Sequence, residues 1–189
     1  MSMLNVTLPD GTVKQVAAGT TPLEVARSIG EGLARQTVAA YLGDELVDAS
    51  RPIESEARLR LVTLNSPEGL EIYRHSTAHL MAHAVKELFG REVQVTIGPA
   101  IESGFYYDFF SDSHTFSPEE FDQIEQKMAE LAKADLPIER QVVTSAEAIE
   151  LFRDMGEEYK VELIEDLGEA EVSLYRQGTF VDLCRGPHI

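Results

Sequence analysis

The opening segment places the strongest local constraint on the fold. Residues 4–8 alternate apolar and polar side chains, Pro9-Asp10-Gly11 favours a reversal, and residues 13–16 return the chain. Period-two alternation next to such a turn is typical of a β-hairpin with one buried face. Another element must therefore cover that face.

The next residues supply this element. Thr21-Pro22-Leu23-Glu24 is a capping box with proline at the first helical position, and Gly30 ends the helix that it opens. Strand-like segments follow at residues 37–42, 45–47 and 59–62. This order is that of a β-grasp, the ubiquitin-like α+β roll. The predicted first domain, residues 1–63, has no histidine or cysteine and no candidate catalytic group.

Residues 64–189 are predicted to form a second α+β domain, with a long central helix packed on an antiparallel sheet. The helix begins after the linker-like residues 65–69 and ends at Gly90. Capping boxes at Ser117 and Thr144 open two further helices. Strands are expected at residues 93–97, 105–109, 138–143, 172–175 and 180–183.

Composition narrows the function classes. The net charge is −17, which argues against a generally basic nucleic-acid-binding surface. Either RNA contact is confined to a local patch, or most of the affinity for RNA lies elsewhere in a longer protein. A single cysteine, no apolar run of ~20 residues and no secretory signal pattern favour a soluble, cytoplasmic protein. Candidates for a local positive rim are Arg58, Arg60, Arg74, Lys86, Lys160 and Arg185.

Three histidines share the long helix. At ~100° per residue, its apolar residues from Leu70 to Leu88 fall on one side, with His75 and His79 opposite and His83 at the edge. The histidines are therefore not expected in the buried stripe. They are either functional residues or exposed surface histidines that have no functional role.

A second cluster follows near the C-terminus, in Asp182-Leu183-Cys184-Arg185-Gly186-Pro187-His188. Gly186-Pro187 prevents a continuous helix, so Cys184 and His188 can converge only through a turn. Together with the helical histidines, these residues suit either a zinc site or a hydrolytic pocket. Ser76 stands where zinc proteases need glutamate, and Asp182 disfavours a thiolate at Cys184. The sequence therefore disfavours both a zinc-protease and a cysteine-protease function.

The two clusters carry a family resemblance. The first domain resembles a TGS domain, and the rest resembles the editing domain of bacterial-type threonyl-tRNA synthetases, which is related to alanyl-type editing domains. The matching stretches are residues 74–80, 97–99, 104–108, 158–161 and 181–188.

The resemblance implies an editing pocket that hydrolyses the ester of mischarged seryl-tRNA. Its implied catalytic residues are His75, His79, Lys160, Asp182, Cys184 and His188. Its implied substrate-contacting or supporting residues are Tyr106, His83, Gly98 and Pro99. We hypothesise that His75 activates water, Lys160 stabilises the carbonyl oxygen and Asp182 pairs with the seryl ammonium.

The resemblance also implies partners and cofactors. The partners are the acceptor end of threonine tRNA and a seryl or threonyl group, with no membrane. Editing is expected to need no metal, although zinc stays open. ATP and a further zinc belong to the class II core, which lies outside these residues. A monomer is expected here and a homodimer in the longer parent. The alternatives are a non-catalytic tRNA- or protein-binding module and a zinc-dependent free-standing editing protein.

Overall fold

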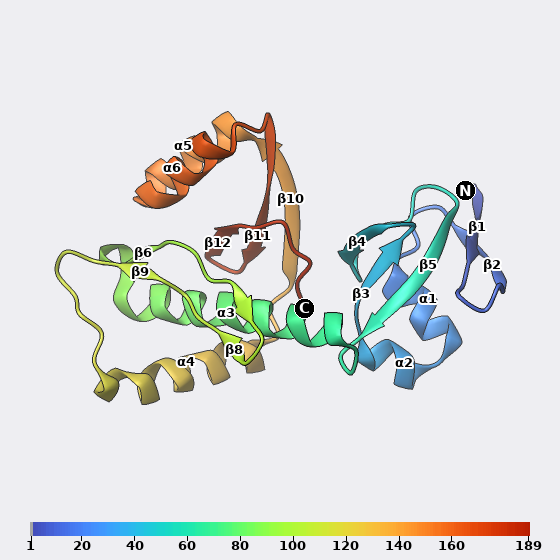
Figure 1. Ribbon diagram of the computed structural model, residues 1–189, viewed down its shortest axis with the longest axis horizontal. Helices are drawn as coiled ribbons and strands as arrows, with labels where there is room; N and C mark the ends of the chain where they lie inside the picture. The colour runs from blue at the N-terminus through green and yellow to red at the C-terminus, as the bar shows by residue number, and fades with distance from the viewer. Residues whose placement is uncertain (1) are drawn as a thin grey trace. The chain divides into compact units, whose positions relative to one another are not determined.

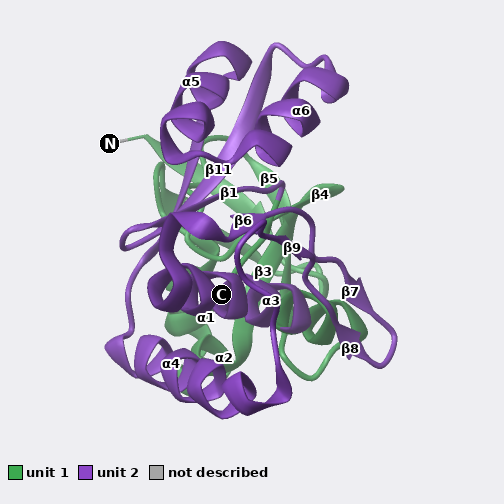
Figure 2. Ribbon diagram, turned by 90° about the vertical axis from the view of Figure 1, so that its left-hand side faces the viewer, with its two compact units in different colours: residues 1–73, 186–189 green, residues 74–185 purple. Residues whose placement is uncertain are grey.

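The computed structural model describes residues 2–189, which form two compact units (Figures 1 and 2). The first unit extends to Tyr73 and includes Gly186–Ile189, and the second is Arg74–Arg185. Within residues 2–189, no helix has the length and apolar character needed to cross a membrane.

The first unit confirms the predicted β-grasp order. Its five-stranded mixed sheet has the order β2-β1-β5-β3-β4, with β1 antiparallel to β2 and parallel to β5. Gly11, at φ +84°, occupies the hairpin turn, and its N–H donates to the carbonyl of Leu8. The strands are β1 (Met3–Thr7), β2 (Val13–Ala17), β3 (Thr37–Leu42), β4 (Glu45–Asp48) and β5 (Ala57–Thr63).

Helix α1 (Pro22–Ile29) covers this sheet as the hairpin requires, and α2 (Glu31–Gln36) follows it. The Thr21–Glu24 capping box is present in full. Val25 of α1 is buried in one cluster with Val6, Ala40 and Leu59 of the strands. The core of the unit is therefore aliphatic.

The long helix α3 (Pro67–Phe89) begins in the first unit. Ile72 packs with Val38 and Val62, and a Cβ at Gly69 would lie 2.0 Å from the Thr63 carbonyl oxygen. Only glycine permits this close approach. The units therefore divide at Tyr73, ten residues after the boundary predicted at residue 63.

The second unit has two halves that share α3 as a neighbour (Figure 1). One half, called the α3 half, packs α3 against α4 (Phe121–Ala134) through buried Val85, Ile124 and Leu131. It also holds β6 (Gln94–Val95), β7 (Ala100–Ile101), β8 (Gly104–Phe105) and β9 (Phe109–Phe110), with short 3₁₀ turns at Gly90–Glu92 and Pro118–Glu120.

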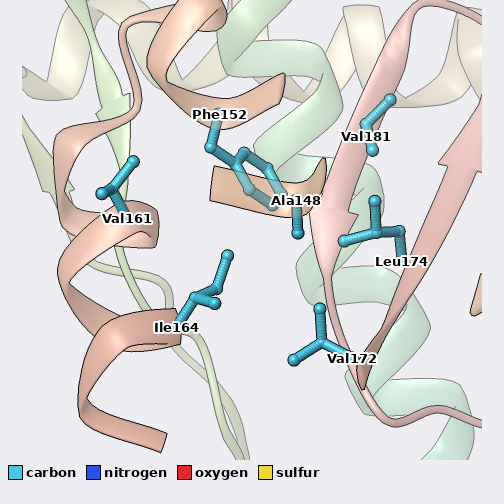
Figure 3. Packing of buried hydrophobic residues seen from close by; sticks show 7 residues of the cluster. All are labelled: Ala148, Phe152, Val161, Ile164, Val172, Leu174 and Val181. Atoms are coloured by element: carbon cyan, nitrogen blue, oxygen red, sulfur yellow. The ribbon is translucent and has the colours of Figure 1, made fainter. Parts of the chain in front are cut away.

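The other half, called the α6 half, is a three-stranded antiparallel sheet covered by two helices. In Figure 3, Phe152 and Ala148 of one helix and Ile164 of the other point toward Val172 and Leu174 of the sheet. Its elements are β10 (Ile138–Thr144), α5 (Ser145–Met155), α6 (Glu158–Leu167), β11 (Glu171–Gln177) and β12 (Phe180–Leu183).

Helix α3 also packs on this sheet, as predicted for the long central helix. Ala78 and Ala82 are fully buried and share a cluster with Phe180 of β12. The face predicted to be apolar is instead partly exposed, since Leu70 and Tyr73 are 42% and 48% exposed. The prediction of a single apolar face on this helix is wrong here, because other elements pack against α3 on more than one side.

Candidate functional site

The two halves of the second unit enclose a cavity of about 620 Å³. This lies within the ~300–1,000 Å³ typical of small-molecule sites. Its apolar walls include Pro99, Leu163 and Val172. Its polar walls include His75, His79, Tyr107, Lys160, Ser173, Asp182 and Cys184.

A thiol and an imidazole meet on one wall. His75 Nε2 lies 3.0 Å from Cys184 Sγ, within hydrogen-bond distance. His75 projects from α3, whereas Cys184 follows β12 and donates its backbone N–H to Ser173 of β11. The prediction that the helical histidines approach the C-terminal cysteine therefore agrees with this geometry.

A buried ion pair forms a neighbouring part of the cavity lining. Lys160 and Asp182 are 3% and 1% exposed, and Lys160 Nζ lies 2.6 Å from Asp182 Oδ1. The backbone N–H of Leu183 donates to the same oxygen, and the Tyr107 hydroxyl donates to Oδ2 at 2.5 Å. Burial alone would raise the pKa of Asp182, but the charge of Lys160, the neighbouring His79 and the hydrogen bonds from Lys160 and Tyr107 lower it below its usual value. Asp182 is therefore ionised at neutral pH.

His79 completes the surroundings of Asp182, with Nδ1 at 3.4 Å from Oδ2. Burial lowers the pKa of His79 to about 4, although the Asp182 carboxylate opposes this. The ring is therefore neutral near pH 7. An ionised carboxylate only accepts hydrogen bonds, so we assign the ring proton to Nδ1 and acceptor character to Nε2.

These contacts correct the role hypothesised for Asp182. A carboxylate offers about four acceptor positions, and Lys160, Leu183, Tyr107 and His79 lie at them. A seryl ammonium would have to displace one of these buried donors. Asp182 is better described as the anchor that orients Lys160 and Tyr107.

Tyr107, rather than Tyr106, lines the cavity. Tyr106 is 48% exposed, whereas Tyr107 is 8% exposed. Neighbouring residues in extended chain point to opposite faces, and two adjacent tyrosines cannot be told apart without the register. The prediction of Tyr106 in the pocket is corrected to Tyr107.

Gly98 and Pro99 do line the cavity, as predicted. A Cβ on Gly98 would lie 2.2 Å from Cδ2 of the Tyr107 ring. The absence of a side chain thus lets this ring lie on the Gly98 backbone. Gly98 thereby helps to place the Tyr107 hydroxyl on Asp182.

His83 lies away from this cavity. It is 1% exposed, stacks on Phe180 with ring centroids 5.2 Å apart, and has Nδ1 3.3 Å from Gln177 Oε1. It lines a separate, smaller hollow instead. Its predicted place on an unburied face is wrong, because the side chain is enclosed between α3 and β12.

His188 belongs to the first unit. It is 6% exposed, and its backbone N–H donates to Asp48 Oδ1 at 3.0 Å. His188 is not among the residues that line the cavity of the second unit.

Two of the six predicted rim cations are paired with carboxylates instead. Lys160 is buried and pairs with Asp182, and the partly buried Lys86 has Nζ 2.5 Å from Glu157 Oε1. Both ammonium groups are thus already engaged by a carboxylate. The sequence gives no direct signal for this, since their partners are 22 and 71 residues away along the chain.

The donor set around the cavity would also suit a metal. The ligand atoms of His75, His79 and Cys184 lie within 4.8 Å of one another. Imidazole nitrogen and thiolate sulfur are the ligands that zinc prefers, and catalytic zinc commonly has three protein ligands. This part of the site is thus chemically compatible with zinc as well as with metal-free hydrolysis.

Comparisons with known proteins found one matching family model and several similar proteins. The family model for the TGS domain matches residues 4–63, which lie within the first unit. The whole chain is 61% identical over 189 residues to a threonine--tRNA ligase of Syntrophotalea carbinolica and 60% identical to one of a Geobacter species. A third, from Francisella tularensis subsp. novicida, is 51% identical over 187 residues. The chain spans about 30% of the length of these curated relatives.

Proposed function

We propose, on the premise of this TGS domain and of the likeness to threonine--tRNA ligases, that the second unit proofreads for such a ligase. The substrate is seryl-tRNA(Thr), and the reaction is hydrolysis of the ester between the seryl carboxyl and the terminal ribose. The observation that carries the proposal is one cavity lined by the His75–Cys184 contact and by the buried Lys160–Asp182 pair.

A second pocket is needed because serine differs from threonine by one methyl group. A pocket shaped for threonine gains only ~1–3 kcal/mol over the smaller analogue, or ~10–200-fold. A separate hydrolytic site that admits serine and excludes threonine supplies the missing discrimination. A volume of about 620 Å³ suits an aminoacylated nucleoside rather than an amino acid alone.

The residues suggest a division of labour. His75 accepts a proton from the attacking water, and this proton passes to the ribose oxygen as the ester bond breaks. Lys160 has three N–H donors, and its contacts among residues 2–189 are Asp182 and Tyr107. The remaining donor can stabilise the oxyanion on the carbonyl, the role that usually contributes most in acyl transfer.

The neutral His79 fits a binding role in this scheme. With its proton held toward Asp182, its acceptor nitrogen suits the seryl or ribose hydroxyl. Cys184 places His75 through their 3.0 Å contact. The threonine tRNA acceptor end is the proposed partner, and the cytoplasm is the proposed compartment because the chain has one cysteine.

The test uses full-length enzyme carrying His75→Ala or Cys184→Ala, with His114→Ala as the matched control. His114 packs with Phe89 and Phe116 and does not line the cavity. Hydrolysis of purified seryl-tRNA(Thr) should fall by roughly 100-fold for His75→Ala and should be unchanged for the control. Unchanged hydrolysis in both site variants would remove the site assignment. Weak hydrolysis by the parent enzyme combined with tight tRNA binding would instead favour a tRNA- or protein-binding module.

We propose that this hydrolysis proceeds without a metal. If zinc were present, His75, His79 and Cys184 would hold it, and it would supply an activated water. Metal analysis of protein purified without chelator distinguishes the two cases. Stoichiometric zinc that is lost in Cys184→Ala would replace the metal-free proposal.

A further inference from the structure

Glu157 is a buried carboxylate that the proposed chemistry does not use. It is 2% exposed and stands directly before α6. Its Oε1 lies 2.5 Å from Lys86 Nζ, and its Oε2 accepts the backbone N–H of Val95 at 2.7 Å. Both partners belong to the α3 half, whereas Glu157 belongs to the α6 half.

The backbone of Glu157 makes hydrogen bonds within the α6 half. Its N–H donates to the carbonyl of Phe152 in α5, and its own carbonyl accepts from the N–H of Lys160 at 3.0 Å and of Val161 at 3.2 Å. Lys160 is thus fixed in the first turn of α6 by the same residue that holds β6. One residue joins α3, β6, α5 and α6.

Lys86 makes a further contact within the α3 half. Its Nζ also donates to the carbonyl of Val93 at 2.8 Å, just before β6. The Gln94 side chain accepts the backbone N–H of Glu158 at 3.1 Å. Residues 93–95 are therefore tied to the start of α6, and they lead directly into Thr96-Ile97-Gly98-Pro99, which line the cavity.

We propose that Glu157, paired with Lys86, is a positioning residue that sets the place of Lys160 relative to residues 96–99 in the cavity lining. It does so by joining the start of α6, which carries Lys160, to β6, which leads into residues 96–99. This inference rests on the proposed hydrolysis for its kinetic consequence, but the placement of Lys160 can be measured independently.

The kinetic experiment compares Glu157→Gln with Glu158→Gln in the full-length enzyme. The control changes the same chemical group one residue later, where the side chain is exposed. Misplacement of a reacting group by about 1 Å can cost ~100-fold, so kcat for seryl-tRNA hydrolysis should fall roughly 10- to 100-fold in Glu157→Gln. KM should change by less than about twofold, because residues that grip the ribose and seryl group remain. Glu158→Gln should match the parent.

An NMR experiment separates this inference from the proposed function. Side-chain signals of Lys160, labelled with ¹³C at Cε and assigned through Lys160→Arg, should shift in Glu157→Gln and stay unchanged in Glu158→Gln. If the parent shows no hydrolysis but the Lys160 signals shift, the proposed function fails and the positioning role stands. Unchanged Lys160 signals with unchanged kcat, whatever the melting temperature, would overturn the positioning role.

A second variant guards against misfolding of Glu157→Gln, which leaves the Lys86 ammonium buried without a counter-charge. The double variant Lys86→Met/Glu157→Gln removes both charges. It should recover the melting temperature but keep the lowered kcat and the shifted Lys160 signals, since the Lys86–Glu157 contact between the halves is still absent. Recovery of all three would show that the pair serves stability alone and would refute the proposal.

Discussion

The two units differ in where they bury charge. Fully or nearly fully buried side chains of the first unit are mainly aliphatic, such as Val6, Val25 and Leu59. The second unit buries Lys160, Asp182 and Glu157 at 3% exposure or less. Burying a charge is costly unless it is paired and hydrogen-bonded. The comparison teaches that the second unit holds a buried electrostatic arrangement that must be paired to be tolerated, whereas the core of the first unit depends mainly on aliphatic packing.

The largest effect is expected from breaking the buried Lys160–Asp182 pair of the second unit. Lys160→Met leaves Asp182 without its cation, and breaking such a pair costs ~3–5 kcal/mol of unfolding free energy. Loss of the proposed oxyanion donor should also lower seryl-tRNA hydrolysis by ~100- to 1,000-fold. Denaturant unfolding and single-turnover hydrolysis measure the two effects. The exposed Lys133→Met is the control, and equal behaviour of the two variants would contradict the comparison.

The counterpart in the first unit is a cavity in its aliphatic core. Leu59 is 1% exposed, so Leu59→Ala should lower the unfolding free energy of this unit by ~2–5 kcal/mol. Hydrogen exchange followed by peptide mass spectrometry should show faster opening of residues 2–73 than in the control Leu64→Ala, at a 40% exposed position. Hydrolysis at low temperature should persist. Its loss would mean that the chemistry depends on the first core.

A pH titration tests the burial of His79. Its pKa is about 4 in the folded protein and 6.5 in the reference state, so the unfolded chain binds the proton more readily between these values. Stability should therefore decrease as pH falls from 6.5 toward 4, by about 3 kcal/mol at most. Asp182, with its lowered pKa, adds a further loss only below its usual value of 3.8. Denaturant midpoints at several pH values measure this slope, which His79→Gln should flatten.

A smaller effect concerns the glycine under the Tyr107 ring. Gly98→Ala forces the ring away, and overpacking of this kind costs ~1–3 kcal/mol. Movement of the hydroxyl from Asp182 should also slow hydrolysis. Gly104→Ala is the matched control, since nothing lies within 4 Å of its added Cβ. Thermal unfolding that fails to separate the two alanine variants would argue against close packing at Gly98.

The smallest expected effect concerns a local feature that the two units share, so the units should not differ in it. Thr21 and Thr144 form the same capping box, with Glu24 and Glu147 respectively. Thr21→Ala and Thr144→Ala should each cost ~1 kcal/mol. Similar losses in hydrogen-exchange stability around α1 and α5 would show that local rules act alike in both units. A large asymmetry would place the difference in the local structure instead of in the buried charge.

The first unit could be predicted from the sequence in most of its elements. The hairpin, the helix after Thr21 and the strand at residues 37–42 depend on alternation, caps and turns, which are local signals. Helix α2 was missed because Gly30, expected to end the preceding helix, also precedes a short second one.

The candidate site could be predicted only in part. The motifs brought His75, His79 and Cys184 together correctly, since each motif is short and chemically distinctive. The choice between Tyr106 and Tyr107 depends on strand register, which local sequence does not encode. Glu157 gave no signal, because its partner Lys86 lies 71 residues earlier and looks like an ordinary surface lysine.

The single sulfhydryl group of the chain gives the cavity its own point of attachment. Cys184 is the sole cysteine in the sequence and lines the cavity beside His75. A maleimide dye or a spin label would therefore tag this wall and no other place in the 189 residues. Slower labelling of Cys184 as an aminoacyl nucleoside is added would then show that this nucleoside enters the cavity. The measurement needs no turnover.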